Sequence, residues 1–150
     1  MNETVVVGAL VAAAINAIPA VWGGWCWYRW HASRAFWLLL RVGQGAAVVY
    51  ALAVGVLAAA GDGSSEKLFY LYALLPLAVA FVAEQLRIAA AQTILDHRGL
   101  ASAQEVGGLP EAEQQEVVAA IVRREQGIMA LSALVVVFLL LRAAETAHGV

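Results

Sequence analysis

Charged residues are scarce in this chain of 150 residues. Asp, Glu, Lys and Arg make up only 13% of it and hydrophobic residues make up 63%, whereas soluble domains carry about 25% charged residues. This composition excludes an ordinary soluble globule. It also excludes intrinsic disorder, which requires low hydrophobicity and high net charge. The net charge of -2 leaves no basic surface that could hold nucleic acid.

Cysteines and reactive motifs are lacking as well. Cys26 is the single cysteine, so an intrachain disulfide, a CxxC redox pair and a cysteine zinc cluster are excluded. The sequence contains no phosphate-binding, dinucleotide-binding, HExxH or GxSxG motif, and no serine has a recognisable base partner. We therefore expect a protein that is not an enzyme and has no cofactor and no metal. A haem between His31 and His97 is geometrically conceivable, but both residues lie in polar connections where a haem would be poorly buried.

Long apolar runs are what the sequence has instead. A helix that spans a bilayer needs about 20 mostly apolar residues. Four stretches meet or approach this length: residues 5–28, 35–60, 68–95 and 128–144. None of them alternates as a transmembrane strand does, and together they leave no room for a separate soluble domain of ordinary size. The predicted fold is therefore all-α, with residues 1–150 forming one integral membrane four-helix bundle.

The arginines predict how these spans are oriented. Cytoplasmic loops of membrane proteins collect Lys and Arg. The second connection has only Lys67 and the C-terminal end only Arg142, whereas the first and third connections are flanked by all the other arginines. These are Arg29, Arg34, Arg41, Arg87, Arg98, Arg123 and Arg124. We therefore expect both termini to face outward and residues 97–127 to be cytoplasmic.

The N-terminal segment and the residue usage predict where the protein resides. No basic residue precedes the first apolar run, which argues against a cleaved signal peptide and for a retained helix. Eight arginines against one lysine, with abundant alanine, indicate a bacterial genome rich in GC. We expect a multi-pass protein of the bacterial cytoplasmic (inner) membrane.

The third connection predicts a helical extension of the bundle. Gly107 indicates a turn, Pro110 suits the first position of a helix, and from there to Ala144 only Gly127 interrupts the helical pattern. Such a helix is about 50 Å long and exceeds the hydrocarbon core of about 30 Å. We expect it to project into the cytoplasm. The alternative is that residues 111–126 lie flat on the membrane surface.

Small residues recur at intervals of four in the first two spans. The first ridge consists of Gly8, Ala12, Asn16, Ala20 and Gly24, and the second of Gly43, Ala47, Ala51 and Gly55. Four-residue spacing keeps each set on one helix face, and small residues let membrane helices approach closely. We expect the two ridges to meet, although an Ala-rich sequence also produces such ridges by chance. Asn16 and Tyr50 are lone polar groups deep in these spans, and each either lines a path or bonds to a neighbouring helix.

Aromatic side chains crowd the boundary at the first connection. They are Trp22, Trp25, Trp27, Tyr28, Trp30 and Trp37. Trp and Tyr favour the headgroup level of a bilayer, so we interpret the set as an interfacial belt. The alternative is an aromatic box that binds a cation or a flat ligand.

Glu84 is the conspicuous ionisable residue within the spans. Such groups are costly in a bilayer and usually face the interior of a bundle. Alignment of the helices from their turns predicts a charge-assisted hydrogen-bond cluster centred on Glu84. Its predicted members are Arg41, Gln44, Glu84, Arg87 and Arg123 or Arg124. The cluster either clamps the helices in register or forms a substrate, anion or proton site that opens inward.

Packing features thus outnumber reactive ones in this sequence. We expect a non-enzymatic accessory or self-associating interaction protein. Its partners are then the lipid bilayer and either further copies of itself or another membrane protein subunit. The alternative is a small transporter or channel with an inward-facing anion or proton site around Glu84.

Overall fold

A computed structural model describes residues 2–147 of the chain. Within them the chain forms five α-helices and no strand. The helices are α1 (Asn2–Tyr28), α2 (Arg34–Ala59), α3 (Lys67–His97), α4 (Ala103–Val106) and α5 (Glu111–Ala147). Four of them, α1, α2, α3 and α5, are long and apolar enough to cross a membrane. The all-α class and the presence of four long apolar helices are therefore confirmed.

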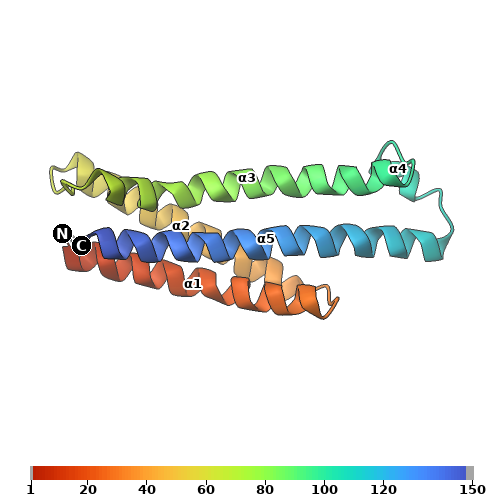
Figure 1. The fold of residues 1–150 in the computed structure, drawn as a ribbon, viewed down its shortest axis with the longest axis horizontal. Coiled ribbons are helices and arrows are strands. Elements are labelled where there is room, and N and C mark those ends of the chain that lie inside the picture. The colour runs from red at the N-terminus through yellow and green to blue at the C-terminus, as the bar shows by residue number, and fades with distance from the viewer. Residues whose placement is uncertain (1, 148–150) are drawn as a thin grey trace.

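The helix α5 organises the fold. It packs extensively against α1 on one side and against α3 on the other, and α1 and α3 hardly contact each other. Figure 1 shows α3 and α5 running antiparallel, with α1 along the opposite side of α5 and α2 crossing behind them. The start of α1 and the finish of α5 lie at one end of the molecule, here called the terminal end. The opposite end of α1, where Arg29 and Arg34 lie, is called the arginine-rich end.

The predicted extension is part of α5 itself. This helix is continuous over 37 residues, which corresponds to about 55 Å. Residues 111–126 continue the axis of the rest of α5 alongside the last turns of α3 (Figure 1). Arg98 Nη2 lies 3.1 Å from Glu116 Oε1 and joins the two helices in this region. The segment is therefore not a separate helix that folds away from the last apolar span.

Three helix ends close in the same way: a residue in the left-handed conformation is followed by an N–H that donates to the carbonyl five residues before it. At the end of α1, His31 N donates to Cys26 O at 2.9 Å, and Trp30 between them has the left-handed φ of 56°. The ends of α2 and α3 use Gly61 and Gly99, with φ of 89° and 70°. Glycine is the usual residue at this position because it has no Cβ to crowd the following carbonyl. Trp30 therefore holds a strained backbone conformation where the sequence would suggest a glycine.

The buried side chains form two clusters. One lies toward the terminal end and includes Phe69 and Leu140, and the other lies nearer the arginine-rich end and includes Phe36 and Met129. All four of these side chains are almost completely buried. Large apolar side chains also cover the outward faces of the helices, as is expected of helices that can face lipid.

Candidate functional site

Glu84 on α3 is the centre of an ionic cluster. Its Oε1 lies 2.5 Å from Arg41 Nη1 on α2, and its Oε2 lies 3.1 Å from Arg87 Nη2. Gln44 Nε2 also donates to Oε1 at 3.4 Å, and Arg41 Nη1 donates to Gln44 Oε1 at 2.7 Å. We call Arg41, Gln44, Glu84 and Arg87 the Glu84 cluster. The structure thus brings together these predicted members from α2 and α3.

The cluster carries one negative and two positive charges, and both carboxylate oxygens are engaged. The side chain of Glu84 is 24% exposed and that of Arg41 is 52% exposed. Arg87 Cζ lies 5.3 Å from the centroid of the Trp37 ring, which holds this guanidinium against α2 by a cation–π contact. The two arginines therefore exceed the carboxylate by one positive charge and tie α2 to α3, two helices that otherwise share limited contact.

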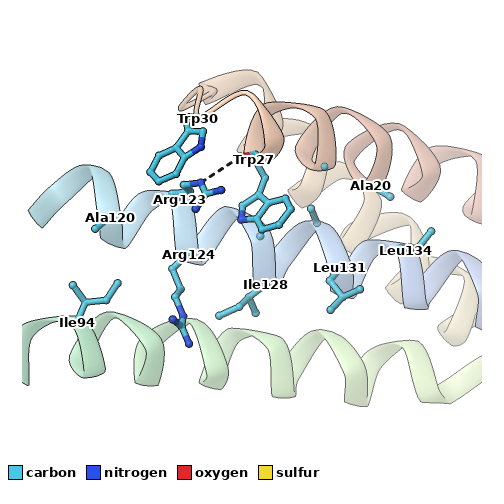
Figure 2. A pocket seen from close by; sticks show the side chains of 13 residues that line it. Ala20, Trp27, Trp30, Ile94, Ala120, Arg123, Arg124, Ile128, Leu131 and Leu134 are labelled. Atoms are coloured by element: carbon cyan, nitrogen blue, oxygen red, sulfur yellow. Dashed lines mark hydrogen bonds between the residues drawn. The ribbon is translucent and has the colours of Figure 1, made fainter. Parts of the chain in front are cut away.

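Arg123 and Arg124 lie away from Glu84, in contrast to the sequence-based prediction. Arg123 turns toward α1, and Arg124 turns toward α3 (Figure 2). Glu125, the next residue of α5, is instead within electrostatic range of Arg87 and Glu84. Successive residues of a helix point about 100° apart, so the alignment by turns found the right level of α5 but the wrong face.

The aromatic residues at the arginine-rich end stack on arginines of the same chain. Arg123 Cζ lies 3.5 Å from the centroid of Trp30 and 5.0 Å from that of Trp27. Arg123 Nε also donates to Trp27 O at 3.4 Å, one of the last carbonyls of α1, where a cation is favoured by the helix dipole. Arg29 stacks over Trp25 at 5.5 Å. The rings of Trp25, Trp27 and Trp30 thus contact arginines of the same chain.

Sequence reasoning missed the pairing of Arg123 with the tryptophans. The only signal was the presence of both residue types near the same predicted boundary. Arg123 and Trp27 are 96 residues apart, and no spacing rule relates positions at that distance. Gln126 was missed for the same reason: it is almost fully buried and its Nε2 donates to His31 O at 3.4 Å.

The small-residue ridges of α1 and α2 approach each other closely at Asn16 and Gly43. Asn16 Nδ2 donates to Gly43 O at 2.9 Å across the helix pair. Nearer the terminal end, a Cβ on Gly8 would lie 3.3 Å from the Tyr50 ring. The ridge alanines are all buried: Ala12, Ala20, Ala47 and Ala51.

The ridges separate at their ends. A Cβ on Gly24 or on Gly55 would meet no atom within 4 Å, so neither glycine allows a close approach between the helices. Tyr50 Oη is buried and has no hydrogen-bond partner among the described residues, whereas Asn16 bonds to the neighbouring helix. The two lone polar groups of these spans are therefore accommodated differently.

An open groove runs along α5 between α1 and α3 (Figure 2). Its volume is about 790 Å³. We call it the α1–α3 groove. Apolar side chains line most of it, and Arg123 and Arg124 lie at its arginine-rich end. It contains no member of the Glu84 cluster.

The histidines and the cysteine do not gather. His31 and His97 are exposed, and Cys26 is buried with a free thiol. Within the described part of the chain, no three His, Cys, Asp or Glu side chains are close enough to hold a metal ion together.

No family model matches the chain, and neither a curated protein nor a solved structure matches it significantly. Functional inference therefore depends on the residues and contacts described above.

Proposed function

We propose that the chain is a non-enzymatic integral membrane protein that acts through its contacts with other membrane components, as an accessory subunit or by self-association. One observation carries this proposal. The carboxylate inside the apolar helices, that of Glu84, is paired with Arg41 and Arg87, while the outward faces are apolar. The described residues therefore offer apolar surfaces for association, and the Glu84 carboxylate among them is already paired.

The proposal includes a membrane placement. The four long helices cross a bacterial cytoplasmic membrane, with the arginine-rich end inside and the terminal end outside. The arginine distribution supports this orientation because cytoplasmic segments collect Arg. At about 55 Å, α5 exceeds a hydrocarbon core of about 30 Å, so its first turns and the last turns of α3 extend into the cytoplasm.

The Glu84 cluster acts in this proposal as a clamp between α2 and α3. Polar contacts between membrane helices are individually modest, averaging about 0.6 kcal/mol. Two contacts across the helix pair, from Arg41 and from Gln44 to the carboxylate of Glu84, fix the register of two helices that have few other contacts. Arg87, on the same helix as Glu84, adds to the clamp through its contact with the Trp37 ring on α2.

The oligomeric state and the bound partners of the purified protein test the proposed interaction role. The full chain is reconstituted in lipid nanodiscs and in detergent, and its mass is measured by light scattering over a range of protein-to-lipid ratios. The mass of a multimer, or a stoichiometric complex with another membrane protein, is expected. A chain that remains monomeric at every ratio and co-purifies without any partner protein contradicts the proposal.

A second candidate function is a small transporter or channel with an inward-facing anion or proton site at the Glu84 cluster. The observation in its favour is the half-exposed guanidinium of Arg41 beside a net positive cluster. Proton and anion flux in liposomes tests it, with the variants Glu84→Gln and Arg41→Gln. Glu145→Gln is the matched control, since Glu145 forms an ion pair with Arg142 near the terminal end. Flux that changes in the first two variants alone supports transport, and flux that is unaltered in all three excludes a role for this cluster.

A further inference from the structure

The α1–α3 groove combines an apolar length with a cationic end. Gly24 lies in its α1 wall, and Leu131 and Leu134 lie along its α5 floor. A Cβ on Gly24 would meet no atom within 4 Å, so no other part of the described chain fills the space beside it. Figure 2 shows the side chains of Leu131 and Leu134 farther along α5 than those of the two arginines.

The two arginines are available for an anion. In the described part of the chain, neither Arg123 nor Arg124 forms an ion pair with a carboxylate. Arg123 donates through Nε to Trp27 O, and Trp30 covers one face of its guanidinium, whereas its Nη atoms form no hydrogen bond within the described residues. Guanidinium groups bind phosphate oxygens with charge-assisted hydrogen bonds.

The length of the groove corresponds to one leaflet. Ten residues separate Arg124 from Leu134, which is about 15 Å along a helix. Half of the hydrocarbon core is also about 15 Å. The arginines lie level with the last turn of α1, because Arg123 reaches the carbonyl of Trp27. The cationic end is thus at headgroup depth when the apolar length lies within the bilayer.

We propose that the α1–α3 groove binds one anionic phospholipid. Its phosphate lies between Arg123 and Arg124, and one acyl chain follows Gly24 and Leu131 toward Leu134. The proposal rests on the membrane placement given above and is independent of self-association. The ligand is thus a phosphodiester with a fatty acyl chain and a net negative charge.

Charge and shape favour this occupant over others. A membrane-spanning helix of about 10 Å diameter would have to bring an anionic group to two unpaired guanidiniums if it occupied this groove. An apolar helix carries no such group and leaves both arginines without a counter-ion. A free anion neutralises the arginines but leaves the apolar length beyond them unoccupied. A lipid satisfies both parts of the groove at once.

Lipid binding to the full chain is measured by native mass spectrometry of the detergent-solubilised protein. The probes are phosphatidylglycerol and the zwitterionic phosphatidylcholine. Both lipids carry a phosphodiester, but only phosphatidylglycerol has a net negative charge, since the choline cation offsets the phosphate of the other. Two guanidiniums at the headgroup, each contributing about fivefold in affinity for an anionic lipid, predict preferential binding of phosphatidylglycerol. Arg124→Gln is expected to lower its affinity about fivefold. Inorganic phosphate in excess is expected to leave the bound lipid in place.

Filling the groove gives a second and independent variant. Gly24→Leu places a side chain in the open space and is expected to lower phosphatidylglycerol affinity about tenfold or more. Gly55→Leu is its matched control, since a Cβ there also meets no atom within 4 Å and Gly55 lies outside the groove. Arg29→Gln is the control for Arg124→Gln, because Arg29 stacks on Trp25 at the same end and does not line the groove. Both controls are expected to bind as the unaltered chain does.

Several results would overturn the inference. They are equal affinity for the two lipids, equal binding by Gly24→Leu and Gly55→Leu, and displacement of the lipid by inorganic phosphate. Loss of a dimer in nanodiscs on Gly24→Leu, with lipid binding unchanged, would assign the groove to a second copy of the chain. Circular dichroism and the elution volume of each variant show that it remains folded. A chain that does not insert into bilayers at all refutes the membrane placement itself and is distinguished from these outcomes by flotation with liposomes.

Discussion

The side-chain amide of Asn16 on α1 donates a hydrogen bond of 2.9 Å to the backbone carbonyl of Gly43 on α2. The two helices are so close here that a Cβ on Gly43 would lie 2.7 Å from Asn16 Oδ1. A backbone carbonyl inside a helix already accepts one intrahelical bond, and its second lone pair is the acceptor available to a neighbour. The absence of a side chain at residue 43 is what allows this contact.

Replacing Gly43 by alanine is expected to destabilise the fold. The added methyl group displaces Asn16 and breaks its interhelical hydrogen bond, and overpacking of this kind costs about 1–3 kcal/mol. Gly45→Ala is the control, since a Cβ there meets no atom within 4 Å and alanine favours a helix over glycine by about 0.5–1 kcal/mol. The free energy of unfolding in mixed micelles measures both. Equal effects of the two substitutions contradict the close contact.

The pair of Arg41 and Glu84 is expected to show a coupling energy between α2 and α3. In a double-mutant cycle with Arg41→Gln and Glu84→Gln, the coupling should be about 0.5–1 kcal/mol, because Arg41 is half exposed. Arg142 and Glu145 form the comparison pair. They lie three residues apart on α5 and are both well exposed, and exposed pairs within one helix contribute at the low end of the range for surface ion pairs, so their coupling should be smaller. A coupling energy of zero between Arg41 and Glu84 would show that this pair does not clamp α2 to α3.

Trp30 is expected to be held in its strained conformation by Arg123. A left-handed backbone costs an L-residue about 1–2 kcal/mol, and an exposed cation–π contact returns about 0.5–1 kcal/mol. Trp30→Gly should therefore stabilise the Arg123→Gln variant by about 1 kcal/mol, since only the strain is then removed. In the unaltered chain the same substitution should have a smaller effect, because the contact at 3.5 Å is lost as well. Identical effects in the two backgrounds, measured by thermal unfolding in detergent, exclude the coupling.

The elements of this fold were predictable because they depend on local sequence. Apolar runs of sufficient length define the four long helices, and Gly61 and Gly99 mark the ends of α2 and α3 by their left-handed conformation. The end of α1 was not marked in this way, since Trp30 occupies the equivalent position. The Trp30 ring contacts Arg123, a residue brought there by tertiary packing alone.

The ionic cluster was predictable in part for a related reason. Arg41 and Gln44 lie three residues apart on α2, as Glu84 and Arg87 do on α3, so each pair shares a helix face. Alignment by the short second connection then brings the two pairs to one level. On α5 the same alignment fails, because a long connection precedes that helix and leaves its rotation undetermined. Glu125 therefore lies within electrostatic range of Glu84 and Arg87, at the level where an arginine was predicted.

Adjacent glycines of α1 provide the sharpest contrast in packing. A Cβ on Gly23 would lie 2.3 Å from Phe36 Cε2 and 3.0 Å from the Ala130 Cβ, whereas a Cβ on Gly24 meets nothing within 4 Å. Phe36 is completely buried and has no room to move, so Gly23→Ala should cost about 2–3 kcal/mol. Gly24→Ala should be neutral or stabilising by up to about 1 kcal/mol, because the α1–α3 groove is open beside it. The midpoint of thermal unfolding in detergent compares the two variants, and a larger loss for Gly24→Ala than for Gly23→Ala would show that α1 is rotated about its axis relative to α2 and α5.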